Sequence, residues 1–459
     1  MVLETQYLKN HKMKRLITLL LFAASASILI SCGDDDNPTK QQLDDIITLA
    51  QDNGFTSLAA ALTKADLVDD LQGEGPFTVF APTNDAFDAL LATIGQESID
   101  DVPTEILTDI LLYHVVSGSV FSEDVAAGDV PTLLADNSIT LATSGGITVN
   151  GVDVISPFDV EASNGVIHTI DGVLVPAGIA AFVNTNLEPA YFNANFTTLV
   201  AAVVKAGLVG TLQDAEALTI FAPTNAAFED AGIVVANTSV EILTSVLTYH
   251  VLGSKVLSTE LPSSAPTLEG NDIFFSITND GVFINATTEI VAVDIESNNA
   301  VVHVLNNVLM PPTGNIVSIA SGNANFSSLV AALTRTANES EENLVEVLSG
   351  DGPFTVFAPT NAAFQALLDS NPEWNELGDI PIGLLSAVLK YHVVAAKAFS
   401  TDLANAVDNN NQIQTVLGDN LTFDLMDLTI NTTTNITGTD INATNGVIHV
   451  IDEVLVPNL

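Results

Sequence analysis

The chain is poor in cysteine and in basic residues. Among its 459 residues there is one cysteine, Cys32, so no disulfide can form within the chain. Lysine and arginine together number 11 against 56 aspartates and glutamates, which gives a formal net charge of −45. A surface of that sign repels phosphate backbones and anionic headgroups. The composition therefore argues against nucleic acid as a partner and against membrane binding through a basic surface.

Several signatures of catalysis and cofactor binding are also absent from the sequence. It has no Gly-x-Ser-x-Gly elbow and no Gly-x-x-x-x-Gly-Lys phosphate loop, and Gly73-Glu74-Gly75 lacks the third glycine of a dinucleotide loop. A calcium loop of the Asp-x-Asp-x-Asp-Gly type is missing, as is the His-Glu-x-x-His spacing of zinc proteases. We therefore expect no enzyme activity, no metal site and no cofactor. Weak cation binding by the acidic surface stays open.

The first 32 residues have the pattern of a secretory signal. A basic segment from Lys12 to Arg15 precedes the apolar run Leu16 to Ile30, which is shorter than a typical transmembrane helix. The residues Leu29 to Cys32 then resemble a bacterial lipobox, in which the cysteine thiol receives a diacylglycerol. The sequence predicts a signal peptide over residues 1–32 and a lipid anchor at Cys32. The alternative is an ordinary secretory signal with an incidental cysteine.

An acidic segment follows the predicted anchor. Residues 33–40 begin with a glycine and three consecutive aspartates. This segment resembles the tether that sends lipoproteins of the Bacteroidetes group to the cell surface. We expect the protein in the cell envelope, attached through Cys32 to the outer membrane and exposed at the surface, with the lipid as its membrane contact. A plain flexible linker is the alternative.

The rest of the sequence contains three copies of one unit. Phe-Ala-Pro-Thr-Asn occurs at residues 80–84, 221–225 and 357–361, and Tyr-His at 113–114, 249–250 and 391–392. Because these words keep their order at a spacing of about 140 residues, each copy is long enough for a core of its own. We place repeat 1 at residues 41–176, repeat 2 at 177–311 and repeat 3 at 312–459.

A third word closes each copy. Repeat 1 ends in Gly165-Val166-Ile167-His168-Thr169-Ile170-Asp171, and repeat 3 has its equivalent from Gly446 through His449 to Asp452. The copy in repeat 2 is weaker. There Ala300 replaces the glycine, His303 is kept, and Asn306-Asn307 stands at the aspartate position.

Hydrophobic periodicity indicates mixed α and β structure within each repeat. Phe55, Leu58 and Leu62 fall at helical spacing, and Phe77 to Phe80 form a short apolar strand that Pro82 ends. Thr83 or Asn84 is a suitable N-cap for a helix starting near Ala86, and a second helix is expected over 105–113. The remainder reads as a set of antiparallel strands ending in the one that contains the histidine. In repeat 3, an extra polar stretch around residues 338–342 is expected to form a surface loop.

These three words resemble the two homology boxes and the intervening Tyr-His motif of the fasciclin domain family. The likeness covers essentially all of residues 41–459. It implies an α+β fold in each of three tandem domains, a wedge of two β-sheets with helices packed at one side. It also implies extracellular adhesion, so we expect a non-catalytic lipoprotein that binds an extracellular protein or polysaccharide. The alternative is an enzyme or small-ligand carrier that uses a cleft between the repeats.

Two sets of candidate residues follow. In animal members of the family the Tyr-His segment is linked to integrin binding, which implies a partner-binding surface at Tyr113, His114, Tyr249, His250, Tyr391 and His392. Alternatively, these side chains hold a helix to the sheet. The other motif residues are expected to be structural: Thr83, Asn84, His168, Asp171, Thr224, Asn225, His303, Thr360, Asn361, His449 and Asp452. For the histidines, a metal-binding or catalytic role is the less favoured alternative, because apolar strand residues flank them.

Overall fold

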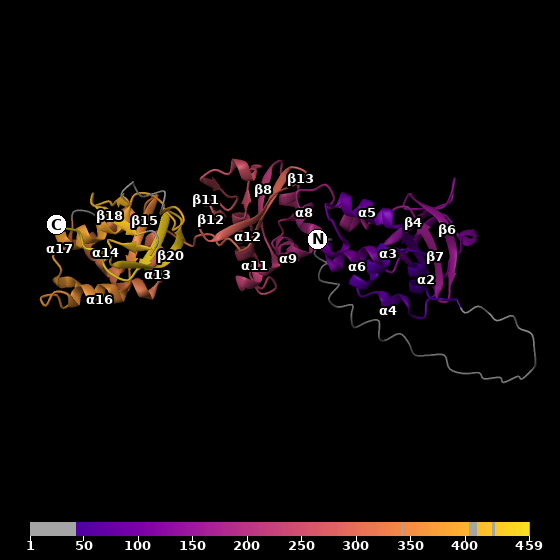
Figure 1. Ribbon diagram of the computed structural model, residues 1–459, viewed down its shortest axis with the longest axis horizontal. Helices are drawn as coiled ribbons and strands as arrows, with labels where there is room; N and C mark the ends of the chain where they lie inside the picture. Colours follow the sequence, from indigo (N-terminus) through magenta and orange to yellow (C-terminus); the bar gives the residue numbers. More distant parts are fainter. Residues whose placement is uncertain (1–42, 341–342, 404–410, 425–426, 459) are drawn as a thin grey trace, which may run out of the picture. The chain divides into compact units, whose positions relative to one another are not determined.

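The structure is a computed structural model that describes residues 43–340, 343–403, 411–424 and 427–458 (Figure 1). The predicted signal peptide, Cys32 and the acidic tether lie outside these residues. The described chain forms two compact units. One consists of residues 43–216 and 295–300, and the other of residues 217–294 together with the described part of 301–458.

Repeat 1 begins with helices and ends with strands. Its elements are α2 (Ile46–Asp52), α3 (Thr56–Lys64), α4 (Val68–Leu71), β1 (Phe77–Pro82), α5 (Asn84–Thr93), η3 (Ile99–Asp101), α6 (Thr104–Tyr113), β2 (Val115–Ser117), η4 (Ser122–Asp124), β3 (Gly128–Pro131), β4 (Ser138–Ala142), β5 (Thr148–Val149), β6 (Val152–Ala162) and β7 (Gly165–Ile170).

Repeat 2 follows the same order after two short helices. Its elements are α7 (Ala177–Ala180), α8 (Glu188–Tyr191), η5 (Ala194–Phe196), α9 (Thr197–Lys205), α10 (Val209–Gln213), β8 (Leu218–Pro223), α11 (Asn225–Asp230), α12 (Val240–Tyr249), β9 (Val251–Leu252), η6 (Ser258–Glu260), β10 (Ser264–Pro266), β11 (Asp272–Thr278), β12 (Gly281–Ile284), β13 (Thr288–Ser297) and β14 (Ala300–Leu305).

Repeat 3 has the same plan within its described residues. Its elements are α13 (Ile316–Gly322), η7 (Ala324–Phe326), α14 (Ser327–Glu339), α15 (Leu344–Ser349), β15 (Phe354–Pro359), α16 (Asn361–Asp369), η8 (Leu377–Asp379), α17 (Ile382–Tyr391), β16 (Val393–Val394), β17 (Gln412–Gln414), β18 (Asn420–Asp424), β19 (Thr429–Ile430), β20 (Thr434–Ala443) and β21 (Gly446–Ile451).

Within the described residues, seven strands of each repeat are linked by hydrogen bonds into one sheet. In repeat 1 the order is β2-β1-β7-β6-β5-β4-β3, and repeats 2 and 3 have the same order with their own strands. The long strand β6 joins the two halves, because it pairs with β5 at its start and with β7 over the rest of its length. A register shift between Ile155 and Val160 marks the irregular point. The two expected sheets of the wedge are therefore connected through one shared strand.

The strands from β3 to β7 pair antiparallel in chain order, as the sequence predicted, but the sequence did not show how β1 joins them. β1 pairs with β7 in parallel over its whole length, from Phe77 opposite Gly165 to Pro82 opposite Ile170. β15 and β21 pair in the same way. Both central strands are buried along almost their whole length, as parallel pairs usually are. The alternation of residues along a strand shows which side chains are buried, but it does not show the direction of the neighbouring strand.

Helix boundaries agree with the local chemistry of the sequence, with one exception. Thr83 is the N-cap of α5, which begins at Asn84. In repeat 3, the polar residues Asn338 and Glu339 belong to α14 and not to a loop. α14 therefore has 13 residues where its counterparts α3 and α9 have 9. Residues 341–342 lie outside the described part of the chain.

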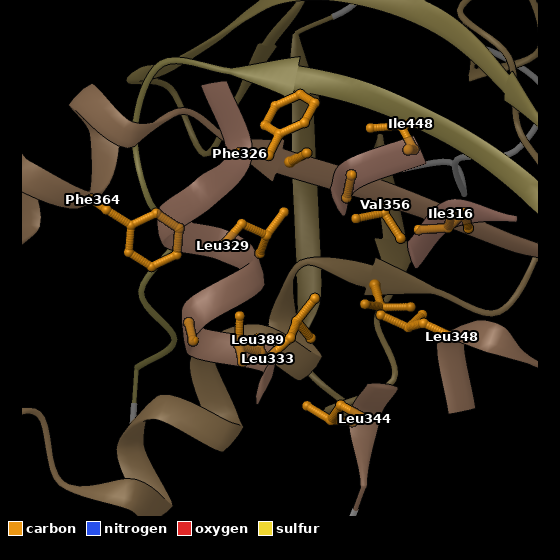
Figure 2. Packing of buried hydrophobic residues seen from close by; sticks show 14 of the residues in the cluster. Ile316, Phe326, Leu329, Leu333, Leu344, Leu348, Val356, Phe364, Leu389 and Ile448 are labelled. Carbon is orange, nitrogen blue, oxygen red and sulfur yellow. The ribbon is translucent and has the colours of Figure 1, made fainter. Parts of the chain in front are cut away.

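The core between the helices and the sheet is apolar. In repeat 3, Leu329 and Leu333 of α14 face Val356 of β15 and Ile448 of β21, and Leu389 of α17 lies beside them (Figure 2). A second cluster on the other side of the same sheet includes Phe357. Burial of side chains of this size contributes about 1.5–3 kcal/mol each, so repeat 3 has a substantial core.

No single helix in the described ranges has the length and hydropathy of a membrane span. One bent pair, Ile316–Gly322 with Ala324–Glu339, reaches the limits of length and composition only when its two helices are taken together across a bend of 103°. Several apolar side chains of this pair belong to the core of repeat 3.

Candidate functional site

The tyrosines of the Tyr-His words are buried at the ends of helices. The hydroxyl of Tyr113, the last residue of α6, donates a hydrogen bond to the carbonyl of Ser138 at 2.9 Å. It also accepts one from Asn150 Nδ2 at 2.9 Å. Tyr249 and Tyr391 have equivalent partners, namely Asp272 and Asn285 for the former and Asn420 and Asn431 for the latter. Each tyrosine therefore attaches its helix to the strands that follow.

The histidines of the same words have both ring nitrogens engaged. His114 Nδ1 donates to the carbonyl of Ile110 at 2.7 Å, and Nε2 accepts from the backbone N–H of Leu174 at 2.9 Å. This pairing fixes the neutral tautomer with the proton on Nδ1. Burial lowers the pKa of His114 to about 4, against the opposing effect of the bond to Ile110. His250 and His392 have equivalent bonds and the same lowered pKa.

The closing-box histidines are bonded in the opposite sense. His168 is 1% exposed, and its Nε2 donates to the carbonyl of Val120 at 2.8 Å. Its Nδ1 accepts from the backbone N–H of Asp159 at 3.4 Å, and the ring stacks on Phe80 with centroids 5.6 Å apart. His303 and His449 repeat this arrangement with their own neighbours. In the described part of the chain, the six motif histidines thus all bond to backbone groups.

A serine and an aspartate next to this histidine do not complete a catalytic triad. Ser122 donates its backbone N–H to Asp159 Oδ1 at 2.7 Å, and its hydroxyl donates to Oδ2. Since the serine binds the carboxylate directly, no imidazole lies between them to accept the hydroxyl proton. The same contact joins Ser258 to Asp294 and Ser400 to Asp440. The contact between Ser122 and Asp159 holds β6 at its register shift. The serine is not positioned to act as a nucleophile.

The Thr-Asn words cap one helix and hold another. Thr83 Oγ1 accepts from the N–H of Ala86 at 3.1 Å. Asn84 reaches back to the start of α3, where Oδ1 accepts from the N–H of Ser57 and Nδ2 donates to the carbonyl of Gly54, both at 3.0 Å. Thr224 and Thr360 cap their helices in the same way, Asn361 repeats the bonds of Asn84, and Asn225 begins α11.

The closing aspartates lie at strand ends. Asp171 Oδ1 accepts from the N–H of Asp153 at 3.1 Å, and Asp452 Oδ1 accepts from the N–H of Asn435 at 2.8 Å. In repeat 2, Asn306 Oδ1 makes the equivalent bond to the N–H of Glu289 at 2.9 Å. An amide oxygen can therefore replace a carboxylate at this position, because the bond needs only a hydrogen-bond acceptor.

Sequence reasoning missed a set of structural asparagines. Asn164 accepts from the N–H of Ile46 at 3.0 Å and donates to the carbonyl of Leu71 at 2.7 Å, thereby attaching α2 and α4 to the strand region. Asn445 does the same in repeat 3. In repeat 2 the corresponding bond is made by Asn186, whose Oδ1 accepts from the N–H of Asn299 at 3.0 Å. Asn164 and Asn445 each precede a glycine, and an Asn-Gly pair is equally typical of a simple turn, so the sequence alone does not indicate these bonds.

The described residues offer little for small-molecule chemistry. Across the described ranges, no group of three or more His, Asp or Glu side chains is arranged to hold a metal ion, and no buried side-chain nitrogen or oxygen lacks a hydrogen-bond partner. A cavity in repeat 1 has a volume of about 10 Å³, which is room for about one water-sized sphere. Its lining is apolar apart from His114, whose two nitrogens are already bonded.

Comparison with known families identifies the repeated unit. A family model described as Fasciclin domain matches residues 53–176, 194–311 and 324–457. These matches contain all three recurring words of each repeat, including the buried tyrosines and histidines described above.

Curated relatives match along most of the chain. Transforming growth factor-beta-induced protein ig-h3 of Sus scrofa is 31% identical over 407 residues, which cover 88% of this chain and 56% of that protein. Periostin of Homo sapiens is 28% identical over 417 residues, with 89% and 46% covered. Protein sll1483 of Synechocystis sp. is 47% identical over 122 residues, 27% of this chain and 67% of that protein. The chain thus spans about half the length of the first two relatives.

One solved structure, described as a FAS1 domain pair from the insect cell adhesion molecule fasciclin I, covers 57% of this chain. The identity is 16% and the TM-score is 0.29.

Proposed function

Because the chain belongs to the fasciclin domain family, we propose that it is a surface-anchored, non-catalytic adhesion lipoprotein that binds an extracellular protein or polysaccharide. One observation carries the proposal: the polar side chains of the recurring words bond within each repeat. Side chains engaged in this way stabilise the fold and are not free to act on a substrate. Binding must then use the outer surface of the repeats.

The position of the partner contact follows from exposure. Tyr113 and His114, like their counterparts, are buried, so a partner cannot reach these side chains while the repeat is folded. Next to a Tyr-His word, α12 of repeat 2 has two exposed apolar side chains, Val240 at 44% and Ile242 at 54%. Ile106, the counterpart of Ile242 in repeat 1, is 8% exposed. We place the contact at the start of α12 around Ile242, where apolar area remains to be buried by a partner.

Anchoring rests on the sequence of the first 40 residues. The lipobox-like Leu29 to Cys32 supplies one thiol, and Cys32 is the only cysteine in the chain. An acidic tether then separates the lipid from repeat 1. Attachment in this manner presents the repeats to the outside, and the strong negative charge keeps them soluble in salt.

Whole-cell adhesion tests the function directly. Bacteria that produce the wild-type chain should bind surfaces coated with polysaccharide or matrix protein, and should label with radioactive fatty acid. Cys32→Ala should abolish labelling, release or misprocess the protein, and reduce adhesion. Ser31→Ala, which keeps a small residue before the cysteine, is the matched control and should behave as wild type. Retained lipid labelling in Cys32→Ala would exclude the anchor, whereas full labelling without adhesion in the wild type would exclude the adhesive role.

Partner contact on α12 has its own test. Ile242→Ser should weaken adhesion by at least several-fold and leave the melting temperature unchanged, because the side chain is exposed. Thr104→Ser, at an exposed position at the start of the corresponding helix of repeat 1, is the control. Unaltered adhesion in Ile242→Ser would place the contact elsewhere.

A further inference from the structure

A half-buried lysine lies where repeats 2 and 3 meet inside the second compact unit. Lys397, in the loop after β16, donates from Nζ to Asn442 Oδ1 at 2.7 Å. The same Nζ lies 4.0 Å from the ring centroid of Phe274, on β11 of repeat 2, and 5.2 Å from that of Phe399. The two rings are themselves 5.7 Å apart. The amine therefore contacts aromatic rings from both repeats.

Hydrogen bonds beside the lysine join the same two repeats. Ser276 Oγ, on β11, donates to Asp402 Oδ1 at 2.7 Å and accepts from Thr401 Oγ1 at 2.9 Å. Asn442 Nδ2 donates to the hydroxyl of Tyr249 at 3.2 Å. Directional bonds at several points, together with the aromatic contact, favour one docking geometry over a set of loosely related ones.

The corresponding positions of the other repeats differ from this arrangement. Five residues after the Tyr-His histidine, repeat 3 has Lys397, repeat 2 has Lys255 and repeat 1 has Ser119. The position of Asn442, two residues after the strand aspartate, is occupied by Glu296 in repeat 2 and Glu161 in repeat 1. Repeat 3 thus has an amide where its counterparts have a carboxylate, so the position beside Lys397 supplies a hydrogen bond without neutralising the charge.

We propose that Lys397 latches repeats 2 and 3 into one rigid pair, because its amine lies over Phe274 of repeat 2 while it is held by Asn442 of repeat 3. Burial lowers the pKa of Lys397 to about 8, and the charge of Asp272 opposes that shift only in part. The aromatic rings also favour the charged amine. The other ionisable groups around the latch are Asp402 and Tyr249, and burial raises the pKa of Tyr249 to about 12, so its hydroxyl stays neutral.

The amine is the part of the latch that a substitution can remove without opening a cavity. Methionine keeps a long apolar side chain but has no charge to lie over the rings and no donor for Asn442, so Lys397→Met should weaken docking.

Spin-label distances measure this ratio in the whole chain. Cys32→Ser removes the native thiol, and Glu241→Cys and Glu373→Cys place one label at an exposed position in each repeat. Mild urea, below the unfolding of either repeat, populates both the docked and the separated forms. Electron–electron double resonance at pH 7 then gives the ratio of docked to separated pairs. Near-ultraviolet circular dichroism confirms that every variant is folded.

The wild-type latch should give a narrow docked distance. Lys397→Met should lower the docked population and broaden the distribution, because the amine is lost. Lys255→Met, the same change at the corresponding position of repeat 2, should leave the distribution as it is in the wild type. An unchanged docked population in Lys397→Met would overturn the latch. A single broad distribution for the wild type under all conditions would overturn the rigid pair itself.

Discussion

The imidazole of His114 accepts a hydrogen bond from the backbone N–H of Leu174, a residue 60 positions further along the chain. His250 and Leu309 form the same pair in repeat 2, and His392 and Leu455 in repeat 3. The Tyr-His word and the residues that end each repeat are therefore joined directly. The Tyr-His sequence recurs because in each repeat its histidine bonds to the residues that end the repeat. This explains why a histidine is present at positions that are buried.

Acid should weaken the repeats through these buried histidines. Burial lowers the pKa of His392 to about 4, so the folded state binds the proton less readily than the unfolded chain does. The stability that depends on the neutral ring is complete above the unfolded pKa of about 6.5, and it is lost as pH falls toward 4. Between pH 7.5 and pH 5 the loss is about 2 kcal/mol for one such histidine.

Urea unfolding of wild type and His392→Gln at the two pH values measures this loss. The glutamine side chain keeps a donor and an acceptor but cannot be charged by acid. The pH dependence of the repeat 3 transition should therefore shrink by about 2 kcal/mol in the variant. An equal pH dependence in both proteins would show that His392 does not carry the acid sensitivity.

His449→Ala should lower the stability of repeat 3 by about 1–3 kcal/mol, because the carbonyl of Ala398 and the N–H of Asp440 lose their partner. The measurement is the melting temperature of that repeat in the full chain. His168→Ala should act equally on repeat 1. Should either variant melt like the wild type and instead lose a chelator-sensitive activity, the structural role of these histidines would have to be abandoned.

Close backbone approach makes Gly446 sensitive to substitution. A Cβ at this position would overlap the carbonyl oxygen of Phe354 on the neighbouring parallel strand. Gly446→Ala should destabilise repeat 3 by about 1–3 kcal/mol, measured by urea unfolding. The control is Gly383→Ala in the first turn of α17, where a Cβ meets nothing within 4 Å and alanine favours the helix more than glycine does. Equal stability of the two variants would contradict the observed strand contact.

Repeat 1 should fold by itself. Its sheet closes on a cluster that contains Phe80, Tyr113 and Ile170, all of them within residues 41–176. Expression of that segment alone should give one cooperative thermal transition with native circular dichroism. If the segment melts gradually while the full chain melts sharply, the predicted boundaries do not coincide with a folding unit.

The sequence predicted the order of the elements well, because the signals are local. Pro82 ends a strand, Thr83 caps a helix, and the apolar spacing of Leu58 and Leu62 gives a helix face; the structure has each of these features. Family membership adds the mixed α and β fold of the three repeats. These predictions depend on residues that are close together in the chain, which the sequence shows directly.

Relationships between distant residues could not be predicted in this way. The parallel pairing of Phe77 with Gly165 joins segments that are far apart, and no periodicity encodes it. No local pattern singles out Asn164, yet its side chain accepts a hydrogen bond from Ile46 at the start of the repeat. The contact of Lys397 with Phe274 depends on how two repeats meet, which neither segment shows alone. Hydrogen bonds and ring contacts of this kind are seen only in the folded structure.

Binding of purified residues 33–459, the chain without its predicted signal peptide and lipid anchor, to an array of polysaccharides and extracellular matrix proteins tests the adhesive role most directly. We expect saturable binding to at least one class of ligand. Chelators should not change this binding, and Ile242→Ser should weaken it. Wild-type protein that is fully folded and yet binds no member of the array, or that converts a substrate in a chelator-sensitive reaction, would contradict the account.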